Sequence, residues 1–280
     1  MCMRILFFCP LWGSENLKFS HFVQQVKAAG YDGVEMSFPF NDPQELKHRI
    51  TVLKDASLLF IGQHWETVNT NLEMHKKEYQ DRLFNLASGN PIFINSQTGR
   101  DFFSFEQNRE LIEVATAFTA KTGIRVLHET HRGKFSFAAH ITKNFLLANE
   151  QLRITADFSH WTNVAETLLQ DQPEAVNLAI DRADHIHARV GFQEGPQIPD
   201  PRAAEWEETI HAYLNWWDRM IHRADSEGKE VFTITPEFGP YPYMTILPHS
   251  REPISNQWDV NVYMMSFLKK RYSNKIELVQ

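Results

Sequence analysis

The stretch RITADFSHW, residues 153–161, begins like a buried strand but carries Asp157 and His160 at its C-terminal end. A strand that only had to be buried would continue in valine or leucine. Together with seven other short apolar runs it alternates with segments of helical periodicity. The eight predicted strands cover residues 4–10, 32–38, 58–65, 91–97, 124–130, 153–160, 184–190 and 231–238. Eight strand–helix units predict a closed parallel (β/α)8 TIM barrel.

The chain of 280 residues has the length of one such barrel, which typically takes ~250 residues. No linker rich in glycine or serine interrupts it, so we predict a single domain over residues 1–280. Two long segments, 191–202 and 239–256, follow predicted strands. Loops in this position lie at the C-terminal face of a barrel, where they shape the substrate site.

The composition excludes several classes of partner. A formal charge of −7 disfavours binding to a phosphate backbone, so no nucleic-acid partner is expected. The apolar start MCMRILFFCPLW is too short to span a bilayer and lacks a cleavage site for a signal peptidase, and no later window is long enough to cross a membrane. Cys2 and Cys9 are interpreted as reduced thiols, which predicts a cytoplasmic protein.

Ionisable side chains recur near the C-terminal ends of the last four strands, at Glu129, Asp157, His187 and Glu237. Alternation along each strand directs them toward the barrel axis, opposite an apolar face that meets helices. Three carboxylates this close would repel, and at least one would take up a proton unless a cation lay among them. Oxygen-rich ligands of this kind predict one divalent ion, Mn²⁺ or Mg²⁺ first, with Co²⁺ and Zn²⁺ as alternatives.

Five motifs follow one another along the predicted strands, namely YDGVEM (31–36), HETH (128–131), DFSH (157–160), HIHARV (185–190) and PEFG (236–239). Through them the chain resembles the xylose-isomerase-like TIM barrel superfamily, the sugar phosphate isomerase/epimerase group, over nearly its whole length. The resemblance implies that one metal is bound by Glu129, Asp157, His187 and Glu237. It also implies that His160 and Arg189 hold the substrate.

The chemistry implied by the resemblance is proton abstraction beside the carbonyl of a ketose or related hydroxycarbonyl compound. The metal would polarise the carbonyl, while Glu129 and Glu237 act as base and acid around a cis-enediolate. We therefore expect a small sugar or sugar acid as the partner. No phosphate-cradling glycine loop is evident, which favours an unphosphorylated compound. Dimers and tetramers are usual in the group, so a homo-oligomer is one expectation.

Four other residues are candidates for substrate contacts. Trp12 and His64 end the first and third predicted strands and are expected to wall the pocket. Glu35 points inward from the second strand, where substrate contact and a role in the barrel floor are equally supported. His131 follows Glu129 into a loop, where solvent and substrate are equally plausible neighbours.

Other functions remain open at this level. A dehydratase or a hydroxypyruvate-type isomerase would use the same metal and the same proton transfer on another substrate. A non-catalytic carbohydrate- or metal-binding barrel is a third reading, against which both glutamates argue. An abasic-site endonuclease of the same superfamily would need ligands for three zinc ions, whereas this sequence offers ligands for about one.

Overall fold

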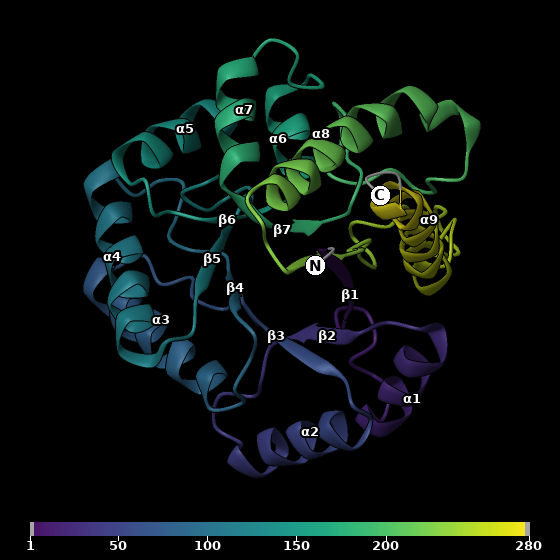
Figure 1. Ribbon diagram of the computed structural model, residues 1–280. Helices are drawn as coiled ribbons and strands as arrows, with labels where there is room; N and C mark the ends of the chain where they lie inside the picture. Colours follow the sequence, from purple (N-terminus) through teal and green to yellow (C-terminus); the bar gives the residue numbers. More distant parts are fainter. Residues whose placement is uncertain (1–2, 278–280) are drawn as a thin grey trace.

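The computed structural model describes residues 3–277 and contains the predicted closed barrel (Figure 1). Its strands are all parallel and pair in chain order, and β8 pairs with β1 to close the ring. The strands are β1 (Arg4–Pro10), β2 (Gly33–Met36), β3 (Leu59–His64), β4 (Ile94–Ser96), β5 (Val126–Glu129), β6 (Ile154–Ala156), β7 (Ala183–His187) and β8 (Val231–Thr235). The prediction of a (β/α)8 TIM barrel is therefore confirmed.

Helices surround the barrel on its outside (Figure 1). They are α1 (Phe19–Ala29), α2 (Pro43–Asp55), α3 (Leu72–Ala87), α4 (Phe105–Thr122), α5 (Ala139–Ala148), α6 (Phe158–Ala165), α7 (Pro173–Arg182), α8 (Glu207–Ser226) and α9 (Gln257–Glu277), with a short 3₁₀ helix η1 (Ala204–Trp206) before α8. Their apolar faces and the outward faces of the strands form the main hydrophobic core. The helices thereby cover the strands that hold the inward polar residues.

The opening stretch of the sequence folds differently from the predicted strand 153–160. Strand β6 ends at Ala156, and α6 begins only two residues later, at Phe158. The reason is local, because the Asp157 carboxylate accepts a hydrogen bond from the backbone N–H of Ser159 (3.1 Å) and so caps the helix. His160 consequently lies in the first turn of α6, where a helix rather than a strand orients it.

The interior of the barrel changes from apolar to polar along its axis. Four buried side chains, Phe8, Ile61, Phe93 and Leu127, form a separate apolar cluster. Gly33 makes room for it, since a Cβ at this position would lie 2.4 Å from the Phe8 ring. The residues that follow toward the C-terminal ends of the strands are polar, among them the buried side chains of Glu35, Asn95 and His185. The polar groups are thereby held on a rigid, closed base.

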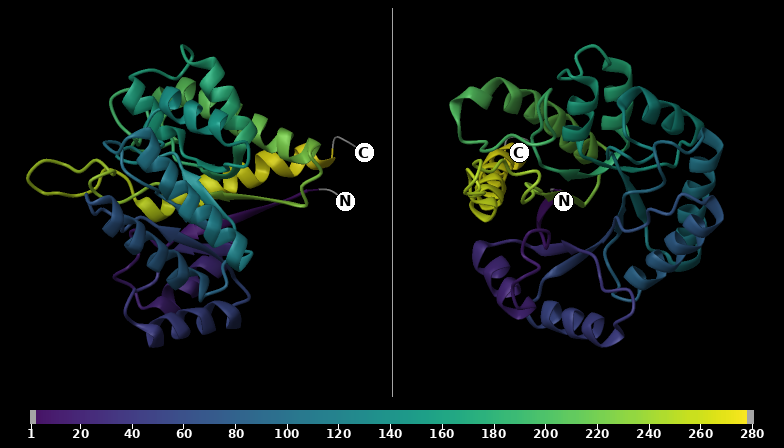
Figure 2. Two further views of the ribbon diagram at one scale, coloured as in Figure 1. Left: turned by 90° about the vertical axis from the view of Figure 1, so that its left-hand side faces the viewer. Right: turned by 180° about the vertical axis from the view of Figure 1, so that it is seen from behind.

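The loop between β8 and α9 projects beyond one end of the barrel, opposite the end near which both termini lie (Figure 2). It returns on itself through an antiparallel bridge between Ile246 and Pro253. This end of the barrel also carries the C-terminal ends of the strands, as predicted for segment 239–256. Within residues 3–277 none of the helices combines the length and apolar character needed to cross a membrane.

Candidate metal centre and cavity

The four side chains predicted as metal ligands meet at the C-terminal end of the barrel. Glu129 ends β5, Asp157 follows β6, His187 ends β7 and Glu237 follows β8. All are buried, and one potential ligand atom of each lies within 4.8 Å of the others. The Nδ1 atom of His187 lies 2.8 Å from Glu237 Oε2 and 3.8 Å from Glu129 Oε1. Four neighbouring strands thus place an imidazole and three carboxylates around one point.

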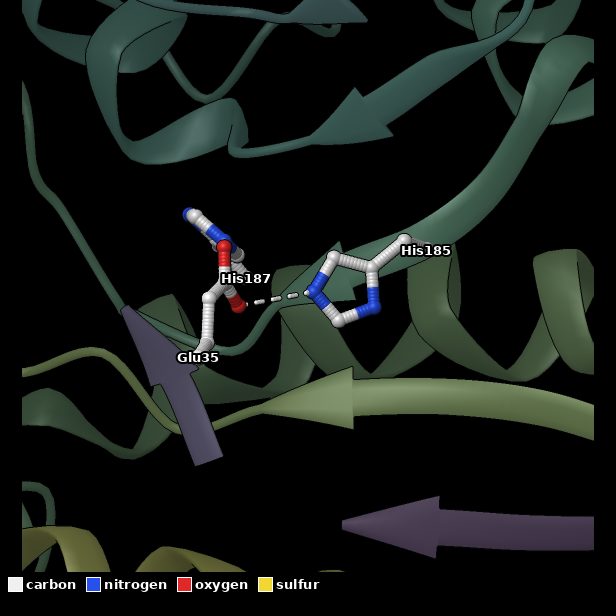
Figure 3. A group of neighbouring side chains, drawn as sticks. All are labelled: Glu35, His185 and His187. Atoms are coloured by element: carbon white, nitrogen blue, oxygen red, sulfur yellow. Dashed lines mark hydrogen bonds and ion pairs between the residues drawn. The ribbon is translucent and has the colours of Figure 1, made fainter. Parts of the chain in front are cut away.

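The carboxylate of Glu35 contacts the imidazoles of both His187 and His185 (Figure 3). Its oxygens contact four groups, the Nε2 atoms of His187 (3.0 Å) and His185 (3.2 Å), the hydroxyl of Thr235 (2.6 Å) and the amide nitrogen of Asn95 (2.9 Å). A carboxylate at Nε2 favours the tautomer with its proton there, so we assign the Nδ1 lone pair of His187 to the side of the ligand carboxylates. Glu35 therefore lies beneath the candidate metal centre and does not line the cavity.

The arrangement fits a divalent cation. His187 Nδ1 makes no hydrogen bond with any described residue, although Glu237 Oε2 is only 2.8 Å away. Burial, and then the negative charges of Glu237 and Asp157, raise the pKa of Glu129 to about 8. A cation would relieve this crowding of acids, and an imidazole with three carboxylates is a ligand set for Mn²⁺, Mg²⁺ or Co²⁺. Glu129, Asp157, His187 and Glu237 are the residues that would hold it.

Arg189 brings a positive charge to the edge of the same cluster. Its buried guanidinium forms an ion pair with Asp157, and its Nε donates to the hydroxyl of Ser159 (3.1 Å). Its Nη2 lies 2.8 Å from Nε2 of His160 and 3.8 Å from Glu237 Oε2. Because an arginine can only donate, we assign the proton of His160 to Nδ1, which has no partner among the described residues. Arg189 therefore holds both the carboxylate of Asp157 and the imidazole of His160 in place.

His131 stacks against His160, with 3.9 Å between the ring centroids. Its Nδ1 donates to the carbonyl of Arg132 (2.6 Å), which leaves Nε2 as an acceptor. Burial and the charge of Arg189 lower the pKa of both imidazoles well below the usual range, so both are neutral at pH 7. Together with Glu129 they form a second close group of potential ligands. The guanidinium of Arg189 against His160 opposes a second cation there.

A cavity of about 460 Å³ opens above the cluster. Of the residues predicted to contact metal or substrate, it is lined by Trp12, Glu129, His131, Arg189 and Glu237. Tyr243, from the loop after β8, also lines it and packs edge-on against Trp12 at 5.0 Å between ring centroids. The same Tyr243 ring lies 4.6 Å from the guanidinium carbon of Arg189. The long loop therefore supplies an aromatic wall over the charged floor.

The placement of His64 corrects the expectation that it walls the pocket. Its ring lies behind the barrel wall, 4.8 Å from the ring of Tyr79 in α3. Its two nitrogens contact the hydroxyls of Ser96 (3.0 Å) and Thr67 (2.7 Å). The inward residue at this end of β3 is Gln63, which lines the cavity. Successive residues of a strand point to opposite faces. The prediction was therefore wrong by one residue, since Gln63 faces the cavity and His64 faces away from it.

The sequence interpretation missed three amide side chains near the carboxylates, namely Gln63, Asn95 and Gln97. Gln63 donates to Glu237 Oε1 (2.9 Å), and Asn95 donates to Glu129 Oε2 (2.9 Å). The alternation of side chains along the strand could have identified Asn95. It shares a face with Phe93, which belongs to the apolar cluster inside the barrel. The amide side chains of Asn and Gln carry no charge, so the pattern of ionisable residues in the sequence does not reveal them.

Comparisons with known proteins place the fold. No family model matches the sequence, and no curated protein matches it significantly. Among solved structures, the probable 3-DHS dehydratase AsbF from Bacillus anthracis is 17% identical, with a TM-score of 0.59 over 95% of this chain and 99% of that one. A D-allulose 3-epimerase from Methylomonas sp., solved in complex with D-allulose, is 14% identical, with a TM-score of 0.63 over 97% of this chain and 100% of the other.

A xylose isomerase domain protein from Planctomyces limnophilus is 13% identical, with a TM-score of 0.61 over 98% of this chain and 100% of that one. These structures share one architecture, and the chain has the fold of the xylose isomerase-like TIM barrels. The predicted resemblance is thereby confirmed for the fold. Sugar epimerases and a dehydratase are among the proteins that share it, and buried residues that could hold a metal occupy its C-terminal end.

Proposed function

We propose that this protein is a divalent-metal-dependent isomerase or epimerase that acts on a ketose or related hydroxycarbonyl compound by proton transfer. The observation that carries the proposal is the position of Glu129 and Glu237. Both carboxylates line the floor of the cavity, and both belong to the group of four potential metal ligands. A substrate on this floor meets two proton-transfer groups at once. The bound metal would polarise the substrate carbonyl and acidify the adjacent C–H bond.

The side chains divide the remaining work. One glutamate removes the proton beside the carbonyl, and the other returns a proton to another carbon or to the other face, which gives an isomer or an epimer. Glu129 and Glu237 both reach the cavity, so either could exchange a proton with a substrate bound there. Arg189 lines the same floor, and its guanidinium would stabilise negative charge that develops on a substrate oxygen. His131 Nε2 would accept a hydrogen bond from a substrate hydroxyl.

The charges of the lining favour an unphosphorylated substrate. Arg49 and Arg189 are the cations of the described lining, and each is already paired, with Glu45 (2.7 Å) and with Asp157. A phosphate would find no unpaired cation there, and it would meet Glu15 and Glu66 on the cavity wall. Trp12 and Tyr243 instead offer aromatic faces to the C–H groups of a sugar. D-Allulose and L-ribulose are the first compounds to assay, because two of the similar structures are a D-allulose 3-epimerase and an L-ribulose 3-epimerase.

Proton transfer is tested by the origin of the product hydrogen. With Mn²⁺ or Mg²⁺ present, turnover in D₂O should place deuterium in the product, and EDTA should abolish turnover until metal is restored. Glu129→Gln and Glu237→Gln should each lower kcat by about 10²- to 10⁴-fold, because each removes a proton-transfer group. Glu106→Gln, on the exposed face of α4, serves as a control with normal turnover. Complete retention of substrate hydrogen, or normal turnover by either cavity variant, would exclude this mechanism.

A dehydratase is the second candidate, favoured by the similarity to the probable dehydratase AsbF. The same abstraction of a proton would then be followed by loss of a neighbouring hydroxyl as water. The two functions differ in their product, since an isomerase conserves the mass of its substrate and a dehydratase lowers it by one water. Mass spectrometry of reactions with ketoses and with hydroxylated keto acids separates them.

A further inference from the structure

Two glutamine side chains hold the two glutamates on the cavity floor. Gln63, in β3, donates its amide to Glu237 Oε1 at 2.9 Å. Gln97, directly after β4, donates to both oxygens of Glu129, at 3.3 and 3.4 Å. Both glutamines line the cavity together with the carboxylates they contact. Each glutamate therefore receives a neutral donor at the point where substrate would lie.

The contacts of Glu237 divide its two oxygens between two tasks. Oε2 faces the candidate metal centre, 2.8 Å from His187 Nδ1 and 3.8 Å from Arg189. Oε1 faces Gln63. A hydrogen bond to one oxygen fixes the rotation of the carboxylate plane, and it leaves a second lone pair of Oε1 for a proton. A neutral amide orients this oxygen without the larger loss of basicity that an arginine or lysine would cause.

We propose that Gln63 is a positioning residue that aims Glu237 Oε1 at the reacting C–H bond of the substrate, and that Gln97 does the same, to a smaller extent, for Glu129. The inference rests on the proposed function, because it assumes proton transfer by the two glutamates. It extends that function by assigning the proton-accepting atom of Glu237 and the side chain that orients it.

The two glutamines are not equivalent. Among residues 3–277, Gln63 provides the single side-chain amide bond to Glu237, at an ordinary length. Gln97 makes two long contacts to Glu129, which is held more closely by Asn95 at 2.9 Å. Loss of the Gln63 amide therefore frees Glu237 to rotate, whereas loss of the Gln97 amide leaves Glu129 with its stronger partner. The order of effects follows from these distances and is a specific expectation of the inference.

The experiment compares Gln63→Met and Gln97→Met, which keep side-chain length and remove the amide. With saturating Mn²⁺, Gln63→Met should lower kcat by about 10- to 100-fold, the range for a misplaced catalytic group, and Gln97→Met by less than tenfold. KM, and the Kd for Mn²⁺ measured separately by electron paramagnetic resonance, should stay within about threefold of wild type for both variants. Gln63→Met leaves the Oε2 side of Glu237 untouched, and in Gln97→Met the amide of Asn95 still holds Glu129. Gln63→Asn, with a shorter amide, should be intermediate and serves if the methionine variant does not fold.

Three results would overturn the inference. These are a kcat for Gln63→Met within threefold of wild type, a rise in the Mn²⁺ Kd that matches the loss of kcat, and a larger effect from Gln97→Met than from Gln63→Met. Failure of the proposed function is visible without any variant, since wild-type protein would then put no solvent deuterium into its product. If wild-type protein puts solvent deuterium into its product and Gln63→Met has a normal kcat, only the positioning role is refuted.

Discussion

Replacement of Glu35 tests whether the buried hydrogen bonds beneath His187 prepare it to bind a metal. Glu35 lies outside the cavity, so a substitution there removes no substrate contact. Its carboxylate accepts from His187 Nε2 at 3.0 Å and thereby presents Nδ1 to the other candidate ligands. Glu35→Gln keeps one acceptor oxygen but loses the negative charge. In the wild type, this charge stabilises the N–H donor of His187 and raises the basicity of its imidazole.

The size of the effect can be worked from these contacts. Loss of an outer partner of a metal-binding histidine typically weakens metal affinity about 10- to 100-fold, or about 1.4 to 2.7 kcal/mol. Glu35→Gln, which retains part of the bond, should lie near tenfold. Glu35→Leu would leave the buried N–H of His187 without its acceptor, at about 1 to 3 kcal/mol, and would also remove an acceptor from Thr235 and one of the two acceptors of Asn95, so it should reduce stability as well.

The assay is titration of chelator-treated protein with Mn²⁺, followed by electron paramagnetic resonance at pH 7.5. Glu15→Gln is the matched control, because it removes a carboxylate from the cavity wall without contacting His187. It should change the Kd by less than about threefold, since a charge exposed to solvent is screened. A folded Glu35→Gln protein with the wild-type Kd would refute the reasoning, as would equal weakening in both variants.

Two further predictions concern the cavity wall. Gly239→Ala would place a Cβ 2.1 Å from the Trp12 ring, so the ring should shift. Steady-state kinetics should then show that KM rises about tenfold, which is the equivalent of one lost aromatic contact. The Kd for Mn²⁺ should stay unchanged. Burial lowers the pKa of Lys134 to about 8, so the folded protein binds fewer protons than the unfolded chain between about pH 8 and 10.5. Denaturant unfolding should therefore show that wild type gains about 2 kcal/mol relative to Lys134→Met as the pH rises from 7 to 10, and parallel pH profiles would contradict it.

The fold and the four central side chains could be predicted from the sequence because both depend on periodicity. Eight apolar runs separated by helical segments leave few architectures, and the chain forms the expected barrel. Glu129 and His187 end strands whose inward and outward faces differ clearly in polarity. Parallel strands of a closed barrel bring their C-terminal ends together. The convergence of side chains 108 residues apart in sequence, from 129 to 237, therefore follows from topology.

The remaining contacts could not be predicted, because they depend on registers and loops that periodicity does not define. Strand β3 is buried on both faces, so its pattern did not show that Gln63 faces inward and His64 outward. At Asp157 a helix cap replaced the end of a strand, because a short-range hydrogen bond competed with strand continuation. Tyr243 reaches the cavity from a loop of irregular backbone, for which no side-chain alternation exists.

The charges at the end of the barrel explain why one divalent ion suits this cluster better than two. Glu129, Asp157 and Glu237 are buried within a few ångströms of one another, and Arg189 compensates one of their charges. A single divalent cation would neutralise the other two charges, and it would relieve the repulsion that adds to burial in raising the pKa of Glu129. A second ion between His131 and His160 would add two uncompensated charges beside the Arg189 guanidinium. Of these two imidazoles, His131 lines the cavity and is the one that a substrate would meet, whereas His160 is buried behind it.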